Sequence, residues 1–88
     1  MTAAWYVYMV ECADGTLYTG IATNAVRRIK EHNSNDRLSS RYTRSRRPVT
    51  LVYVEFCVGR AAATRREYAI KRLTRREKQS LIKSRQAE

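Results

Sequence analysis

The chain has 88 residues, with 18 Lys and Arg against 8 Asp and Glu, and a formal net charge of +10 at pH 7. This length leaves room for one domain over residues 1–88, because a chain this short buries only about 60% of its unfolded surface. The hydrophobic content of 43% speaks against a disordered chain, and the charge predicts a polyanionic partner, DNA or RNA, more than a surface tuned for solubility.

The first third of the chain predicts a β-hairpin followed by a helix. Residues 5–12 are rich in β-branched and aromatic side chains, Asp14-Gly15 marks a turn, and residues 17–22 have the composition of a returning strand. Thr23 or Asn24 is a suitable N-cap for a helix that ends near residue 33.

The register of this hairpin decides which side chains meet. A three-residue loop that ends at Gly15, with Gly15 in the left-handed region, would pair Val10 with Tyr18. Tyr8, Tyr18 and Gly20 would then share one face of the sheet. We predict this arrangement, in which Gly20 lies opposite Tyr8 and its missing side chain leaves space for a phosphate.

The middle of the chain predicts a third strand. Residues 34–47 read as a polar, Arg-rich connection without a regular element. Pro48 then introduces residues 49–58, a run of strand formers that could lie centrally in a small sheet, and Gly59 ends it.

The last third predicts two helices. Apolar residues recur at helical spacing over residues 60–73, and Thr74 with Glu77 three residues later forms a capping box that starts a final helix to about residue 83. The order β-β-α-β-α-α indicates an α/β (α+β) fold, a three-stranded sheet with an N-terminal hairpin flanked by helices.

Several classes of site and location are disfavoured. No apolar run approaches the about 20 residues of a membrane span, and a signal peptide is not apparent, so we expect a cytoplasmic protein without a membrane partner. Cys12 and Cys57 lie in apolar runs without CxxC spacing, and the chain has one His. We therefore expect buried, reduced thiols and no zinc site.

Two tyrosine triplets, Tyr6-Val7-Tyr8 and Tyr18-Thr19-Gly20, stand nine residues apart. They resemble the two-part signature of the GIY-YIG (URI) endonuclease superfamily. In that family a helix follows with an Arg and, four residues later, a His or Tyr, a spacing that Arg28 and His32 have here. A later helix carries a metal-binding Glu, which Glu67 matches.

The resemblance covers nearly the whole chain. The run Ile70-Lys71-Arg72-Leu73-Thr74 and the Arg-rich segment before Pro48 are similar to the small single-domain bacterial branch typified by the YhbQ proteins. Tyr6 stands where the family has its first Gly, which affects local backbone geometry more than chemistry. Ile21 stands where some members carry a Lys, so a Lys-assisted mechanism is not assumed.

The resemblance implies metal-dependent hydrolysis of phosphodiester bonds. Tyr8 would accept a proton from the attacking water, Tyr18 would orient water or phosphate, and Arg28 would neutralise charge on the phosphate. His32 would contact the phosphate or position Tyr8. Glu67 would hold one divalent cation, Mg²⁺ or Mn²⁺, with waters completing its shell.

Each of these residues also has a plainer interpretation. At about 100° per residue, Arg28 and His32 lie together at one edge of an apolar stripe formed by Ala25, Val26 and Ile29, whereas Arg27, Lys30 and Glu31 point away. Arg28 could therefore cover the core edge and His32 could be a surface histidine. Glu67 could make surface salt bridges, and the tyrosines could pack in the sheet.

The remaining basic residues predict a surface for sequence-independent contacts with a nucleic-acid backbone, on which Tyr42 could stack on an exposed base. Arg66 falls inside the apolar stripe of its helix, from which it could reach a phosphate. The predicted nucleic-acid contacts are Arg27, Arg37, Arg41, Tyr42, Arg44, Arg46, Arg47, Arg66 and Lys71. The alternative for the 34–47 segment is a flexible loop without ordered contacts.

We therefore expect a structure-specific or weakly selective DNA endonuclease, a monomer or weak dimer, with DNA repair or recombination as its setting. The chief alternative is a non-catalytic nucleic-acid-binding module, for RNA or DNA, in which the tyrosines stack. A protein adaptor that binds an acidic partner is a third reading, but it leaves the spacing of Tyr, Arg and Glu unexplained.

Overall fold

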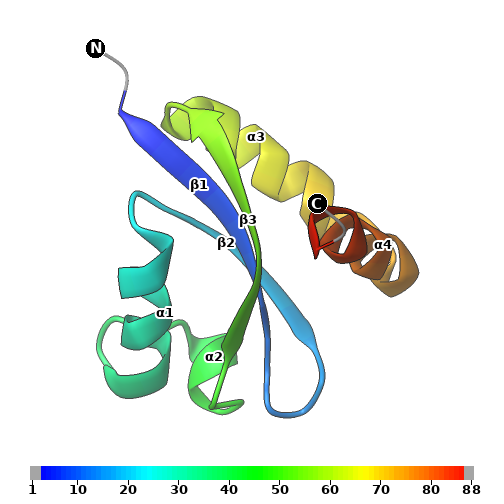
Figure 1. Cartoon of the computed structure of the whole chain (residues 1–88). Helices are drawn as coiled ribbons and strands as arrows, with labels where there is room; N and C mark the ends of the chain where they lie inside the picture. Colours follow the sequence, from blue (N-terminus) through cyan, green and yellow to red (C-terminus); the bar gives the residue numbers. More distant parts are fainter. Residues whose placement is uncertain (1–2, 87–88) are drawn as a thin grey trace.

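Three antiparallel strands form the centre of the computed structural model, which describes residues 3–86 (Figure 1). They are β1 (Ala4–Glu11), β2 (Leu17–Ala22) and β3 (Thr50–Val58), in the order β2-β1-β3. The strand after Pro48 is therefore an edge strand and does not lie centrally. Burial explains this difference, because β1 has four consecutive buried residues from Val7 to Val10, whereas β3 leaves Phe56 and Val58 exposed.

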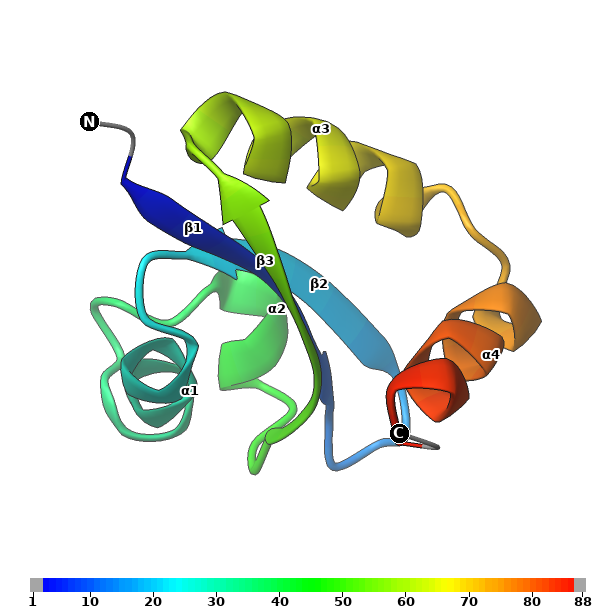
Figure 2. The same ribbon diagram turned by 45° about the horizontal axis from the view of Figure 1, so that its top comes forward.

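Helices flank both faces of this sheet, α1 (Ala25–Ser34) and α2 (Arg41–Arg44) on one side and α3 (Arg60–Lys71) and α4 (Arg75–Gln86) on the other (Figure 2). The α+β class is confirmed, and the order is β-β-α-α-β-α-α. The segment predicted as an irregular connection thus contains the short helix α2. A helix of four residues is too short to show hydrophobic periodicity, although its Ser40 cap is visible in the sequence.

The predicted hairpin register is confirmed. Tyr8 pairs with Gly20 and Val10 pairs with Tyr18. The Cys12 amide donates to the Thr16 carbonyl at 2.8 Å, which closes a three-residue loop, and Gly15 has a φ of +84°. This left-handed backbone favours glycine.

Two cores lie on opposite faces of the sheet. Val7, Met9 and Tyr53 pack with residues of α3 and α4, while Tyr8 and Val10 pack with Ala25 of α1. Alternation along β1 therefore sends Tyr8 toward α1 and its neighbours toward α3. Cys12 and Cys57 are buried free thiols, as predicted.

The helix boundaries follow the predicted caps. The side chain of Asn24 accepts from the Arg27 amide at 3.0 Å and begins α1. The Thr74 amide donates to Glu77 at 2.9 Å and the Glu77 amide donates to Thr74 at 3.1 Å, which confirms the capping box before α4. The last helix extends to Gln86, slightly beyond the predicted end.

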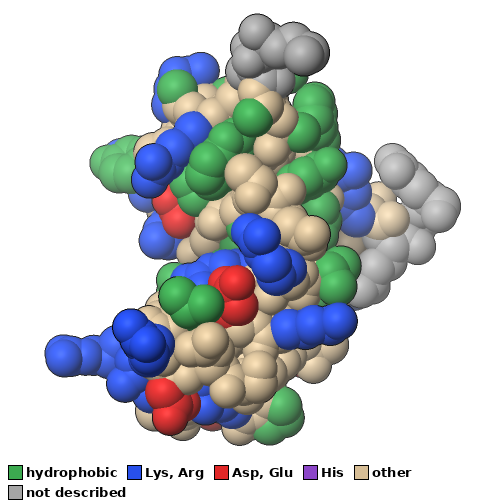
Figure 3. All heavy atoms as spheres, turned by 90° about the vertical axis from the view of Figure 1, so that its left-hand side faces the viewer, with side chains coloured by type: hydrophobic (Ala, Val, Ile, Leu, Met, Phe, Trp, Pro, Cys, Tyr) green, Lys and Arg blue, Asp and Glu red, His purple; other side chains and the backbone are tan. Residues whose placement is uncertain are grey.

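Basic side chains stand out at several places on the surface around α1 and α2, in the lower half of Figure 3, with some acidic side chains among them. Arg37, Arg41 and Arg44 are exposed there. Within residues 3–86, the helices lack the combination of length and apolar composition that a membrane span requires.

Candidate active site

The phenol of Tyr8 lies across Gly20 on the neighbouring strand β2. A Cβ at Gly20 would be 2.6 Å from Cζ of Tyr8 and closer still to its hydroxyl oxygen. Tyr8 itself is only 1% exposed. The space that the missing side chain creates is therefore filled by Tyr8, and the prediction that it would admit a phosphate is wrong.

His32 holds the Tyr8 hydroxyl from α1. The Tyr8 Oη lies 2.8 Å from Nε2 of His32, and the other ring nitrogen, Nδ1, lies 2.8 Å from Oγ1 of Thr43 on α2. His32 is fully buried, so the surface-histidine interpretation is wrong. Because His32 has no exposed surface, it cannot contact a phosphate directly. Of the two predicted roles, the structure supports the contact with Tyr8.

Burial sets the protonation states of this pair. It raises the pKa of Tyr8 to about 12, although the nearby Arg28 guanidinium acts in the opposite direction. It lowers the pKa of His32 to about 4, and the charges of Arg28 and Arg47 add to the effect while Glu31 opposes it. Tyr8 and His32 are therefore both neutral near pH 7.

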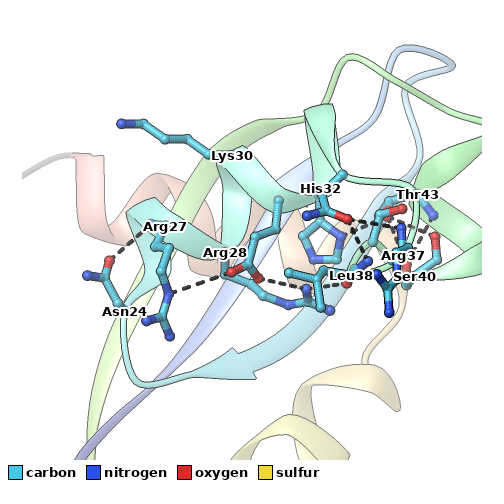
Figure 4. A network of polar contacts seen from close by, with 12 residues as sticks. Asn24, Arg27, Arg28, Lys30, His32, Arg37, Leu38, Ser40 and Thr43 are labelled. Carbon is cyan, nitrogen blue, oxygen red and sulfur yellow. Dashed lines mark hydrogen bonds and ion pairs between the residues drawn. The ribbon is translucent and has the colours of Figure 1, made fainter.

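Arg28 extends from α1 toward β2 beside this pair (Figure 4). Its Nη1 donates to Oε1 of Glu31 at 3.1 Å and to the Leu38 carbonyl. Glu31 does not point away as predicted, because its carboxylate pairs with Arg28; its other oxygen lies 3.7 Å from Nε of Arg27. Arg27 is exposed to solvent, as expected, and Val26 is exposed as well, so the buried stripe of α1 runs through Ala25 and His32 instead.

Tyr18 links three helices at the edge of the sheet. Its ring centroid lies 5.6 Å from that of His32 on α1 and stacks 5.6 Å from that of Tyr42 on α2. Nζ of Lys71 on α3 lies 5.9 Å from the same ring. The partly exposed Tyr18 thus stands where elements from both faces of the sheet approach β2.

Glu67 reaches this edge from the other face. Its Oε2 lies 3.5 Å from Nζ of Lys71, the residue over Tyr18, and its charge acts on the Tyr8 phenol in the direction that raises the pKa. The helices α1 and α3 lie on opposite faces of the sheet beside β2, which is an edge strand (Figure 2). The two phenols, Arg28 and Glu67 are therefore brought to one border.

The donors at this border fit a cation that keeps most of its waters. Among the described residues, three His, Cys, Asp or Glu side chains do not converge on any one point. Glu67 would supply one carboxylate. Mg²⁺ commonly binds through one or two carboxylates together with waters and phosphate oxygens, so the residues suit such an ion and do not form a cage for zinc.

Several residues predicted to contact nucleic acid have protein partners instead. Arg46 pairs with Asp14 at 3.0 Å, and its Cζ lies 3.9 Å from the centroid of Tyr42. With Tyr18 stacked on it as well, Tyr42 is occupied and does not present a free ring to a base. Stacking on a base there would require Arg46 or Tyr18 to leave.

Arg47 and Arg66 are also engaged. Arg47 donates to the His32 carbonyl, to Asp36 at 2.8 Å and to Ser39 at 3.2 Å, and so anchors the connection to the end of α1. Nε of Arg66 lies 3.1 and 2.9 Å from the two carboxylate oxygens of Glu55 on β3. This ion pair explains why Arg66 lies inside the apolar stripe of α3: the stripe faces the sheet, where Glu55 is the partner of Arg66.

Sequence reasoning missed Thr43 and Ser40 as members of this site. Thr43 is fully buried against His32, and Ser40 caps α2 by accepting from the Thr43 amide at 3.1 Å. A Ser ahead of a helical turn is a preferred N-cap, so this helix start has a local signal. The sequence carries no signal that this helix would meet a histidine on another one.

A small antiparallel sheet with two tyrosines on its adjoining strands, an arginine-bearing helix on one face and a glutamate-bearing helix on the other defines the GIY-YIG class of domain. Residues 4–80 match the model of the GIY-YIG catalytic domain. The chain belongs to this family.

Within the family it is similar to UPF0213 proteins. It is 62% identical over 81 residues to the UPF0213 protein of Desulfotalea psychrophila, covering 92% of this chain and 73% of that one. It is 49% identical over 77 residues to the UPF0213 protein of Halobacterium salinarum, covering 88% and 97% of the two chains.

Solved structures agree with this grouping. The solution structure of the UPF0213 protein from Bacillus halodurans is 41% identical, with a TM-score of 0.57 over 91% of this chain and 83% of that one. A protein from E. faecalis is 36% identical, with a TM-score of 0.64 over 100% and 94% of the two chains.

Proposed function

We propose that this protein is a metal-dependent endonuclease that hydrolyses phosphodiester bonds in DNA. The observation that carries the proposal is the position of the Tyr8 phenol, which lies near enough to Arg28, Tyr18 and Glu67 for all three to act on its pKa. These groups come from α1, β2 and α3 and meet at the β2 edge. Phosphodiester hydrolysis needs such a combination of proton acceptor, cation and carboxylate.

The roles follow from the chemistry of each group. Tyr8 accepts the proton of the attacking water, and the Tyr18 hydroxyl orients water or phosphate. Glu67 would hold one Mg²⁺ or Mn²⁺, which when bound would supply positive charge to the phosphoryl oxygens and lower the pKa of bound water. Lys71, which is 3.5 Å from Glu67, would be free to contact the phosphate if the carboxylate held the ion.

Arg28 keeps donors available for the substrate. Both of its hydrogen bonds in the structure use Nη1, whereas a guanidinium carries five N–H donors in a fixed fork. Nε and Nη2 are thus the groups that would bind phosphate oxygens. The pair with Glu31 holds the side chain beside Tyr8, which lowers the entropy lost when substrate binds.

The substrate backbone would cross the exposed arginines near α2. Arg37, Arg41 and Arg44 are exposed, unlike Arg46 and Arg47, which are tied to Asp14 and Asp36. Contacts of this kind do not read sequence. A structure-specific or weakly selective DNA substrate, met in repair or recombination, fits this surface.

The test is cleavage of branched, single-stranded and supercoiled DNA by the purified protein, with and without Mg²⁺ or Mn²⁺. Arg28→Ala and Glu67→Gln should lose cleavage. Lys30→Ala is the matched control for Arg28, because it removes an exposed basic residue of the same helix that points away from the site. Cleavage that persists unchanged in both site variants would identify a contaminant and overturn the proposal.

A second function is a non-catalytic nucleic-acid-binding module for RNA or DNA. Two observations favour it: the Tyr8 phenol is 1% exposed, and Glu67 already has Lys71 as a partner. Binding of these nucleic acids without metal-dependent cleavage would support this function over the first.

A further inference from the structure

A chain of hydrogen bonds runs from Tyr8 through His32 to α2. Its direction decides whether the Tyr8 hydroxyl gives its proton to His32 or keeps it to donate elsewhere. His32 contacts Tyr8 Oη through Nε2 and Thr43 Oγ1 through Nδ1, each at 2.8 Å. A neutral imidazole has one donor nitrogen and one acceptor nitrogen. The chain can therefore run from Tyr8 toward Thr43 or from Thr43 toward Tyr8.

Running from Tyr8 toward Thr43, every proton has an acceptor. The Tyr8 hydroxyl donates to Nε2, Nδ1–H donates to Oγ1 of Thr43, and the Thr43 hydroxyl donates to the Ser40 carbonyl at 3.2 Å. The Ser40 hydroxyl donates to Oγ1 of Thr43 at 2.8 Å and accepts from the Thr43 amide at 3.1 Å. All of these groups are satisfied at once.

Running the other way, one proton is stranded. Nε2–H would donate to the Tyr8 oxygen, and the phenol proton would need another acceptor. Among the residues the structure describes, His32 is the hydrogen-bond partner of this hydroxyl that can accept a proton. The nearby charged group, Arg28, only donates. Tyr8 is 1% exposed in the free protein, so in that state, before substrate and water enter, a phenol proton without an acceptor is unfavourable.

We infer that Thr43 is a positioning residue, which holds the proton of His32 on Nδ1 so that Tyr8 donates to Nε2 and its oxygen stays able to accept a hydrogen bond. In this state Tyr8 presents an acceptor to the attacking water. In the opposite state it would present a donor to the phosphate. The placement of the proton stands on the hydrogen bonds alone, and its catalytic consequence rests on the proposed function.

Burial and the charges of two nearby arginines keep His32 neutral in this arrangement. Burial lowers its pKa to about 4. Tyr8 and Tyr18 face it from the sheet and Thr43 from α2, and the charged groups that act on it are Arg28, Glu31 and Arg47. A bound phosphate would offset the charge of Arg28 and so make Nε2 a better proton acceptor.

The proton steps of hydrolysis then balance. As the water oxygen bonds to phosphorus, its proton passes to the Tyr8 oxygen and the phenol proton passes to Nε2 of His32. The bond from phosphorus to the leaving oxygen breaks, and that oxygen takes a proton from solvent. The imidazolium returns its proton through Tyr8 to solvent, which restores the starting state.

The test is a measurement of the His32 tautomer by long-range ¹H–¹⁵N correlation NMR. The chain contains a single His, so its ring signals need no assignment. The wild-type protein at pH 7 should show protonated Nδ1 and unprotonated Nε2. A wild-type ring protonated on Nε2 would overturn the inference without bearing on whether the protein cleaves DNA.

Variants at Thr43 test its part. Thr43→Val keeps the branched shape but removes the acceptor, so the fraction of Nδ1–H should fall and Nε2–H should appear. Thr43→Ser should restore the wild-type tautomer, and Thr64→Val, which removes an exposed threonine of α3, should leave it unchanged. A folded Thr43→Val protein with the wild-type tautomer would show that Thr43 does not set it.

Cleavage provides a separate readout. Thr43→Val should lower the maximum rate at least about tenfold and shift the pH profile, whereas Thr43→Ser should keep both near wild type. A wild-type protein with Nδ1–H that cleaves none of the DNA substrates would contradict the proposed function alone. If Thr43→Val changes the tautomer of His32 but leaves the pH profile of cleavage the same as in wild type, the tautomer does not affect catalysis.

Discussion

The side chain of Tyr8 occupies the place where a residue other than glycine at position 20 would carry its Cβ. The two residues are paired across β1 and β2, so neither can move away without disturbing the ladder. Their sizes are therefore linked, and the linkage holds the phenol against His32.

Gly20→Ala should destabilise the fold by about 1–3 kcal/mol, the usual range for overpacking a buried site. The added methyl would lie 2.6 Å from Cζ of Tyr8 and would push the ring away from His32. Urea unfolding of the single variants and of Gly20→Ala with Tyr8→Ala measures the coupling. If Gly20→Ala lowers the free energy of unfolding as much in the Tyr8→Ala background as in wild type, the added methyl clashes with a group other than Tyr8.

Stability should depend on pH through His32. The folded pKa of about 4 lies below the ordinary histidine value of 6.5, so the unfolded chain binds a proton more readily. The contribution of neutral His32 to the free energy of unfolding is complete above pH 6.5. As the pH falls toward 4, that free energy decreases by roughly 2–3 kcal/mol. Urea unfolding at several pH values measures it.

The comparison is with His32→Gln, which should show a flatter profile between pH 5 and 6.5. The pKa values of Glu55, Asp14 and Glu77 are also lowered in the fold, but those carboxyls act below about pH 5. Equal slopes for the two proteins between pH 5 and 6.5 would mean that His32 is not the group responsible.

Arg41→Ala with Arg44→Ala should reduce the slope of log affinity against log salt by about 2, because each removes one phosphate contact. Fluorescence anisotropy with duplex DNA over a salt series measures it. Arg66→Ala serves as the control, since Arg66 is committed to Glu55, and it should leave the slope unchanged. An unaltered slope in the double variant would mean that this surface does not contact the backbone.

On the proposed function, we expect Tyr68 rather than Tyr42 to stack on an exposed base. Tyr68 is 63% exposed on α3, one residue beyond Glu67, with Nη1 of Arg72 3.1 Å from its hydroxyl. Tyr68→Ala should weaken binding of single-stranded DNA by about 1–3 kcal/mol per stacked base. Tyr42→Ala should instead lower stability, because Tyr42 packs on Tyr18. Unchanged affinity of the Tyr68 variant, measured by anisotropy, would contradict the stacking.

The sequence predicted those features that local chemistry determines. Gly15 and the loop length set the register of the hairpin, and helical spacing placed Arg28 and His32 on the same helix. The family resemblance supplied the proposed metal-binding role of Glu67. These inferences depend on neighbours within a few residues or on one established pattern.

The features that were missed depend on contacts between distant segments. His32 has the polarity of a surface residue, and its burial is possible because Thr43, eleven residues later, satisfies its second nitrogen. The sequence did not reveal a partner for Arg66 on α3, because that partner, Glu55, lies on β3 and meets it only in the folded protein. The edge position of β3 likewise depends on which strand β1 pairs with, which strand composition does not reveal.

The location of the candidate site on an edge strand limits what one molecule would do to a double helix. One such border faces one sugar–phosphate chain, and the complementary chain runs in the opposite direction on the other side of the helix. On the proposed function, each encounter would sever one chain, so relaxed nicked circles would precede linear molecules when a supercoiled plasmid is the substrate.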